Sequence, residues 1–121
     1  MNQKNILIVD DDSRNIFALS AVLRSKGFAV VSAPSAMEGL ELLKTNANIH
    51  VVLMDIMMPG MDGYEAISQI RSEPSIANTP VIAVTAQAMV GDREKSLEAG
   101  ADAYISKPVD VDVLLGLLNK Y

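Results

Sequence analysis

The sequence contains no cysteine and only one histidine, His50, among its 121 residues. Without cysteine, neither a disulfide framework nor a thiolate metal site can form. His50 lies at the start of an apolar segment, and no nearby residue is placed to act with it. We therefore interpret His50 as a structural or surface residue. The chain also lacks a glycine-rich loop of the GxxxxGKS or GxxxxGKT type, which excludes that way of holding a nucleotide.

Long apolar runs and an excess of positive charge are missing as well. The N-terminal segment MNQKNILIVDDD has only a short apolar run before three acids, so it fits neither a signal peptide nor a membrane span. The formal net charge is -5, which argues against a nucleic-acid backbone as a partner. We expect a soluble cytoplasmic protein with no membrane insertion and no direct contact with nucleic acid.

Half of the residues are hydrophobic, and they fall into short segments separated by helical patterns. Apolar segments typical of buried strands occupy residues 5–9, 28–33, 50–54, 81–84 and 103–106. Helical patterns occupy residues 13–26, 35–45, 62–73, 91–99 and 110–120, with Asp12, Ser35 and Asp62 as expected N-caps. This alternation predicts one α/β domain with a parallel sheet covered on both faces. Right-handed crossovers leave few strand orders, of which 2-1-3-4-5 is one.

Polar residues follow four of the predicted strands. Asp10 and Asp11 follow the first strand, Asp55 the third, Thr85 the fourth and Lys107 the fifth. In open α/β folds the ligand site lies at the carboxyl edge of the sheet. If the strand order is 2-1-3-4-5, these five side chains converge on one cleft.

The chemistry of these side chains is mutually consistent. Clustered carboxylates repel one another unless a cation lies among them, and oxygen ligands suit Mg²⁺. A lysine beside them can pair with a carboxylate and then with a phosphoryl oxygen. No histidine, cysteine or second base is placed to activate a serine. Asp55 is therefore the best candidate nucleophile, although its position alone also fits a residue that starts a turn.

Four motifs in order carry a resemblance to a known family: ILIVDDD at 6–12, LMDIMMPGMDG at 53–63, VIAVTA at 81–86 and AYISKP at 103–108. Together they resemble the receiver domain of response regulators over essentially the whole length. The resemblance implies a flavodoxin-like (βα)5 three-layer sandwich with a five-stranded parallel sheet in the order 2-1-3-4-5. We expect one receiver domain at 1–121 with no output domain.

The resemblance implies a role for each site residue. Asp55 would accept a phosphoryl group from a phosphohistidine, with Mg²⁺ (or Mn²⁺) as cofactor. Asp11 would bind the metal directly, Asp10 mostly through water, Asp55 as a further ligand, and Met57 through its backbone carbonyl. Lys107 would neutralise the phosphoryl group, and the Lys107–Pro108 bond would be cis.

Further positions would control switching and lifetime. Thr85 and Tyr104 would form the switch pair, although Tyr104 could also simply pack. Met57 and Gln87 would flank the path of the attacking water, and an apolar Met57 should slow loss of the phosphoryl group. Phe17, expected to point outward from the first helix, lies where kinases and phosphotransfer proteins usually dock.

The expected function is a phosphorelay signalling module rather than an enzyme with an external substrate. Its phosphodonor would be a sensor histidine kinase or a histidine phosphotransfer domain, and its downstream effector is unknown. The VDDDSRN opening with Asn15, and AVTAQAM at 83–89, resemble receivers of hybrid sensor kinases and also single-domain regulators. Alternatives are a pseudo-receiver used only for docking, and a haloacid-dehalogenase-like phosphatase. The phosphatase class wants a second acid where this chain has Met57.

Overall fold

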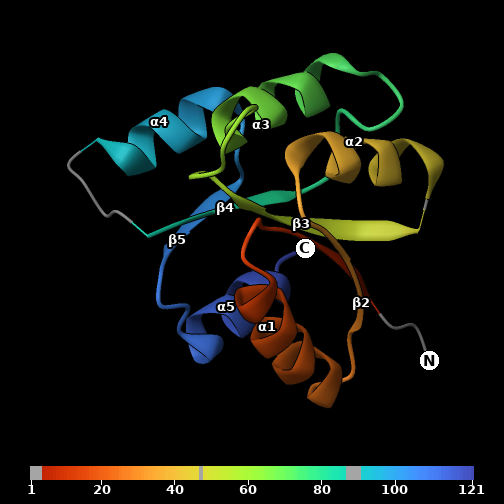
Figure 1. Ribbon diagram of the computed structural model, residues 1–121, viewed down its shortest axis with the longest axis vertical. Helices are drawn as coiled ribbons and strands as arrows, with labels where there is room; N and C mark the ends of the chain where they lie inside the picture. The colour runs from red at the N-terminus through yellow and green to blue at the C-terminus, as the bar shows by residue number, and fades with distance from the viewer. Residues whose placement is uncertain (1–3, 47, 87–90) are drawn as a thin grey trace.

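The computed structural model describes residues 4–46, 48–86 and 91–121, within which strands and helices alternate along the chain (Figure 1). The strands are β1 (Asn5–Val9), β2 (Ala29–Ala33), β3 (Ile49–Asp55), β4 (Val81–Thr85) and β5 (Ala103–Ser106). The helices are α1 (Ser13–Ser25), α2 (Ala36–Thr45), α3 (Gly63–Ser72), α4 (Asp92–Ala99) and α5 (Val111–Leu118). All strand pairs are parallel, and the order is β2-β1-β3-β4-β5. The predicted fold class and strand order are confirmed.

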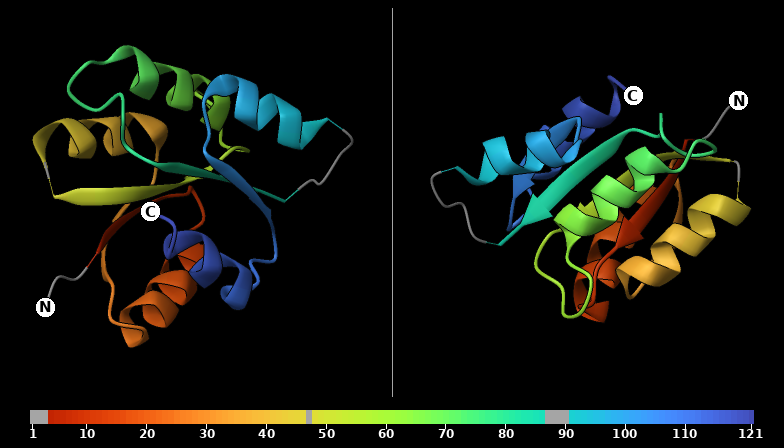
Figure 2. Two further views of the ribbon diagram at one scale, coloured as in Figure 1. Left: turned by 180° about the vertical axis from the view of Figure 1, so that it is seen from behind. Right: turned by 90° about the horizontal axis from the view of Figure 1, so that it is seen from above.

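The sheet separates two layers of helices. Helices α1 and α5 cover one face, and α2, α3 and α4 cover the other (Figures 1 and 2). Each face has its own apolar core, since alternate residues of the central strands point to opposite sides. Leu7, Val52 and Met54 are buried on the side of α2 and α3, whereas Ile8 and Leu53 are buried on the side of α1 and α5.

A polar side chain caps the N-terminus of four of the helices. Asp12 accepts a hydrogen bond from the backbone N–H of Arg14, Ser35 from that of Glu38, Asp62 from that of Glu65, and Asp110 from that of Asp112. The caps predicted at Asp12, Ser35 and Asp62 are confirmed. Helix α4 differs because its cap is Gly91, which has no side chain to donate or accept. Only Ser96 of α4 is buried.

Strands β3 and β4 extend further than the sequence pattern indicated. The pattern ended the third strand at Met54, but Asp55 is its last residue and pairs in register with Val84. The backbone N–H of Ile56 also donates to the carbonyl of Val84 at 2.9 Å. The carboxylate of Asp55 is therefore carried by the sheet itself rather than by a loop.

Among the helices of the described ranges, none combines the length and apolar character that crossing a bilayer requires.

Candidate functional site

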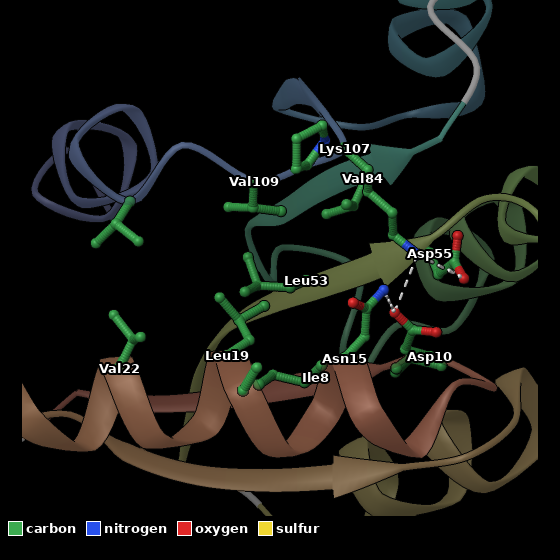
Figure 3. A pocket seen from close by; sticks show the side chains of 14 residues that line it. Ile8, Asp10, Asn15, Leu19, Val22, Leu53, Asp55, Val84, Lys107 and Val109 are labelled. Atoms are coloured by element: carbon green, nitrogen blue, oxygen red, sulfur yellow. Dashed lines mark hydrogen bonds and ion pairs between the residues drawn. The ribbon is translucent and has the colours of Figure 1, made fainter.

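The polar residues at the strand ends meet at the carboxyl edge of the sheet, as predicted. Strand β1 lies between β2 and β3, and β4 lies on the other side of β3. Asp10 directly follows β1, Asp55 ends β3 and Thr85 ends β4. These three side chains are buried, with exposed fractions of 6%, 3% and 2%. Lys107 is the residue that follows β5, and its side chain extends toward Asp55 (Figure 3).

Three carboxylates form a group that could hold a metal ion. Ligand oxygens of Asp10, Asp11 and Asp55 lie within 4.8 Å of one another. Asp11 is exposed, while the other two are buried. Hard oxygen ligands with an open, solvated side fit a divalent cation such as Mg²⁺, which commonly keeps several water ligands. The donor set therefore fits the cation that the sequence predicted.

The raised pKa of Asp55 also fits a cation site. The pKa of Asp55 is raised from 3.8 to about 6, first by burial and then by the negative charge of Asp10, with Lys107 acting in the opposite direction. A carboxylate in this position is strained by desolvation and by repulsion, and an added positive charge would relieve both. The site is thus built to gain stability from a cation.

Lys107 bridges the two buried carboxylates. Its Nζ lies 3.2 Å from Oδ2 of Asp10 and 3.4 Å from Oδ2 of Asp55 (Figure 3). Burial alone would lower the pKa of Lys107, but Asp55 and then Asp10 outweigh it, so that the pKa is raised. Lys107 is therefore a protonated cation beside the candidate nucleophile. The Lys107–Pro108 peptide bond is cis, as the family resemblance implied.

Asn15 belongs to the site, although the sequence analysis assigned it no role there. Its Nδ2 lies 3.3 Å from Oδ2 of Asp10, so the side-chain amide donates to the oxygen that Lys107 also contacts. The backbone N–H of Asp12 donates to the other oxygen, Oδ1, at 2.9 Å. Asn15 is the third residue of α1, and a polar amide so soon after the strand-end acids was the signal that could have identified it.

The loop after β3 places Met57 beside Asp55. The backbone N–H of Met57 donates to Oδ1 of Asp55 at 3.1 Å, and the Met57 side chain is 51% exposed. The predicted role of the Met57 carbonyl as a metal ligand stays a prediction. Gln87, the second position predicted to flank the attacking water, lies outside the described residues.

The predicted switch pair lies on neighbouring strands. Thr85 pairs in register with Ser106, and Tyr104 lies two residues earlier on β5, opposite Ala83. The backbone carbonyl of Thr85 accepts from the N–H of Lys107 at 2.7 Å. Tyr104 is partly buried against the core that α2 and α3 cover, and this burial, followed by Asp92 and Tyr64, raises its pKa. Thr85 therefore lies at the same sheet edge as Asp55, and Tyr104 lies on the adjacent strand within electrostatic reach of Asp92 of α4. Their role as a switch pair stays a prediction.

A pocket of about 210 Å³ opens beside Asp10, Asp55 and Lys107. It lies between α1 and the segment that leads into α5 (Figure 3). Its walls are mostly apolar, and Asp10, Asn15, Asp55 and Lys107 line one end. The site is thus open on the side of α1.

A parallel (βα)5 sheet with three acids and a lysine at its carboxyl edge defines a receiver of two-component signalling. Residues 6–119 match the family described as the response regulator receiver domain, and the chain belongs to this family.

Individual relatives agree with this assignment. The chain is 32% identical over 118 residues to the polar-differentiation response regulator DivK of Brucella ovis, covering 98% of this chain and 95% of that protein. A response regulator receiver protein of Pseudomonas putida has a similar structure, with a TM-score of 0.92, 30% identity and coverage of 100% of this chain and 99% of that one. A further similar structure is that of the Saccharomyces cerevisiae phosphotransfer protein Ypd1 with the receiver domain of Ssk1. That match has a TM-score of 0.82 and 30% identity, and covers 93% of this chain and 83% of that one.

Proposed function

We propose that this receiver works in the cytoplasm, where Asp55 accepts a phosphoryl group from a phosphohistidine and the modified protein changes its affinity for a downstream partner. The observation that carries the proposal is the position of Asp55. Its carboxylate is buried at the end of a central strand, next to Asp10 and 3.4 Å from the ammonium of Lys107. No feature of the core requires a carboxylate with a raised pKa at this point, so its presence indicates chemical use.

The proposed reaction is a direct transfer. A carboxylate oxygen of Asp55 forms a bond to phosphorus while the bond from phosphorus to the imidazole nitrogen of the donor breaks. The electron pair of that bond returns to the imidazole nitrogen, which is a good leaving group when protonated. Mg²⁺ held by Asp10, Asp11 and Asp55, with the Met57 carbonyl as a further ligand, would neutralise charge that develops on the phosphoryl oxygens. Lys107 contributes a second positive charge at the same oxygens.

The response to phosphorylation involves Thr85 and Tyr104. A phosphoryl group on Asp55 offers new acceptor oxygens, and the hydroxyl of Thr85, at the end of the adjacent strand, donates to one of them. Tyr104 then turns inward behind Thr85. Because α4 buries only Ser96, the surface formed by α4 and β5 is the part of the fold that this change alters most readily.

The proposed phosphodonor is a sensor histidine kinase or a histidine phosphotransfer protein. The Ssk1 receiver, which has the same fold, was solved together with the phosphotransfer protein Ypd1. On this chain, Phe17 of α1 is 78% exposed and Met57 is 51% exposed. Exposed apolar side chains near an open site favour docking of an apolar helix face. We propose that the donor docks on α1 and delivers its phosphohistidine over the pocket beside Asp55.

This chemistry changes only the receiver itself, so we propose that the protein has no external substrate. A phosphatase of the haloacid-dehalogenase type would need an acid where the chain has Met57. Met57 cannot act as an acid or a base, and no observation favours that function.

The test is stoichiometric labelling with a small phosphodonor. The purified protein is incubated with phosphoramidate and Mg²⁺, and intact mass is measured. We expect one phosphoryl group on the wild type, none on Asp55→Asn, and one on Asp112→Asn. Asp112 is a matched control because it is an exposed aspartate of α5. Labelling of Asp55→Asn would refute Asp55 as the acceptor. Multiple turnover of phosphomonoesters would favour the phosphatase instead.

A further inference from the structure

Three donors hold the carboxylate of Asp10. Oδ1 accepts from the backbone N–H of Asp12 at 2.9 Å. Oδ2 accepts from Nδ2 of Asn15 at 3.3 Å and from Nζ of Lys107 at 3.2 Å. Figure 3 shows both contacts to this oxygen, one from Asn15 on α1 and the other from Lys107, which follows β5. One oxygen of Asp10 is thus shared between a charged and a neutral donor.

Lys107 cannot keep this arrangement during phosphorylation. Its Nζ also lies 3.4 Å from Oδ2 of Asp55, and a phosphoryl group on Asp55 carries more negative charge than the carboxylate of Asp10. Charge-assisted hydrogen bonds to phosphoryl oxygens draw the ammonium toward them. As Nζ moves with the phosphoryl group, its contact with Asp10 lengthens. A carboxylate that is only 6% exposed then loses a donor, which is unfavourable unless another donor remains.

Asn15 is placed to be that remaining donor. It belongs to the first turn of α1, which is anchored by the Asp12 cap. The fold does not need an amide there for its core, since Asn15 is exposed at the surface. Its amide is neutral, so it satisfies Oδ2 of Asp10 without competing as a charge for the phosphoryl group.

We propose that Asn15 is a positioning residue for phosphoryl transfer: its side-chain amide holds Asp10 in place while Lys107 moves from Asp10 to the phosphoryl group on Asp55. This inference rests on the proposed function. It assigns Asn15 no contact with the phosphoryl group, and its effect is exerted through Asp10 and Lys107.

The test compares rate constants of phosphorylation by phosphoramidate, in which the P–N bond breaks and ammonia leaves as Asp55 forms its bond to phosphorus. Asn15→Leu has a similar size but no donor, and we expect its rate constant to fall roughly tenfold, the effect of losing one hydrogen bond to a charged group. Asn15→Gln keeps the amide and should restore part of the rate. Asn78→Leu makes the same change at an exposed position in the α3–β4 loop and should react like the wild type. Thermal melting in EDTA should show that all three variants are folded.

A double-mutant cycle separates the role from a structural or docking effect. In a Lys107→Ala background no lysine moves from Asp10 to the phosphoryl group. Asn15→Leu should therefore lower the rate constant by less than twofold in that background. An equal effect in both backgrounds overturns the proposal. A loss that is seen only with a protein phosphodonor and not with phosphoramidate also overturns it, because Asn15 would then be a docking residue. If the wild type is labelled and Asn15→Leu reacts at the same rate, only this inference fails. If the wild type takes up no phosphoryl group, the proposed function fails with it.

Discussion

Gly63 lies so close to Asp55 that a Cβ at Gly63 would come within 2.5 Å of the carbonyl oxygen of Asp55. The contact arises because the loop after β3 folds back onto the end of its own strand, where the N–H of Gly63 donates to the carbonyl of Ile56 at 3.1 Å. Gly63 is required for space, whereas Gly60 in the same loop has a φ of 76° and is required for its backbone conformation. The loop that carries Met57 is therefore packed tightly against the end of β3.

Gly63→Ala should destabilise the protein and disturb the site. The added methyl group would meet backbone atoms of Asp55 and Ile56, and backbone cannot move aside as a flexible side chain can. We expect a loss of about 1–3 kcal/mol in the free energy of unfolding, as for other overpacked positions, measured by urea denaturation. Gly116→Ala is the matched control. A Cβ there meets nothing within 4 Å, so this helical substitution should stabilise by roughly 0.5–1 kcal/mol. Equal stability of the two variants would contradict the close packing of Gly63 against Asp55 and Ile56.

The free energy of unfolding should depend on pH through the ionisation of Asp55. Its pKa is raised to about 6 in the folded state, so the folded state binds a proton more tightly than the unfolded chain does. The contribution of Asp55 to the free energy of unfolding is therefore fully present below about pH 4 and is lost as the pH rises through about 6. Between these limits the loss should be on the order of 2 kcal/mol.

The measurement is urea denaturation in EDTA from pH 4 to pH 7.5, for the wild type and Asp55→Asn. Other carboxylates titrate in both proteins, so the difference between the two curves isolates Asp55. We expect Asp55→Asn to become the more stable protein as the pH rises. A constant difference across this range would show that the carboxyl of Asp55 is not perturbed.

Mg²⁺ should stabilise the protein through the three carboxylates. A ligand that binds only the folded state adds about 2.7 kcal/mol at a concentration of 100 times its Kd. In the absence of Mg²⁺, Asp11→Ala should raise the melting temperature slightly, because it removes one negative charge from the group. Added Mg²⁺ should then raise the melting temperature of the wild type far more than that of Asp11→Ala. Asp112→Ala should respond like the wild type, and an equal Mg²⁺ response in Asp11→Ala would rule out Asp11 as a ligand.

The apolar side chain of Met57 should prolong the life of the phosphorylated state. Met57→Asn would replace it with an amide able to orient water toward the phosphoryl group. We expect hydrolysis to accelerate roughly tenfold, below what a well-placed catalytic group contributes, measured as loss of phosphoryl mass after the donor is removed. Met37→Asn changes another exposed methionine, on α2, and should leave the lifetime unchanged. A wild-type lifetime equal to or shorter than that of Met57→Asn would refute the shielding role.

Much of the site was predictable because its residues sit at fixed points of a local pattern. Each apolar segment ends where the strand ends, and the polar residues that follow are carried to the same edge of a parallel sheet. Asp10, Asp55, Thr85 and Lys107 could therefore be named before any distance was known. Asn15 does not end a strand, so this rule does not place it at the site. Its contact with Asp10 depends on the entry angle of α1, which the Asp12 cap and the packing of α1 on the sheet decide together.

By itself the sequence determined the elements: hydrophobic periodicity, N-caps and glycines act over a few residues, and strand and helix positions followed from them. The periodic pattern alone left the strand order open, because several right-handed arrangements bury the same apolar strands. The family resemblance predicted the order, and the tertiary structure establishes it. The order β2-β1-β3-β4-β5 places β1 against β3, and this one pairing brings Asp10 beside Asp55. The raised pKa of Asp55 and the bridging position of Lys107 both arise because the tertiary structure brings charged groups that are far apart in the chain together at a buried edge of the sheet.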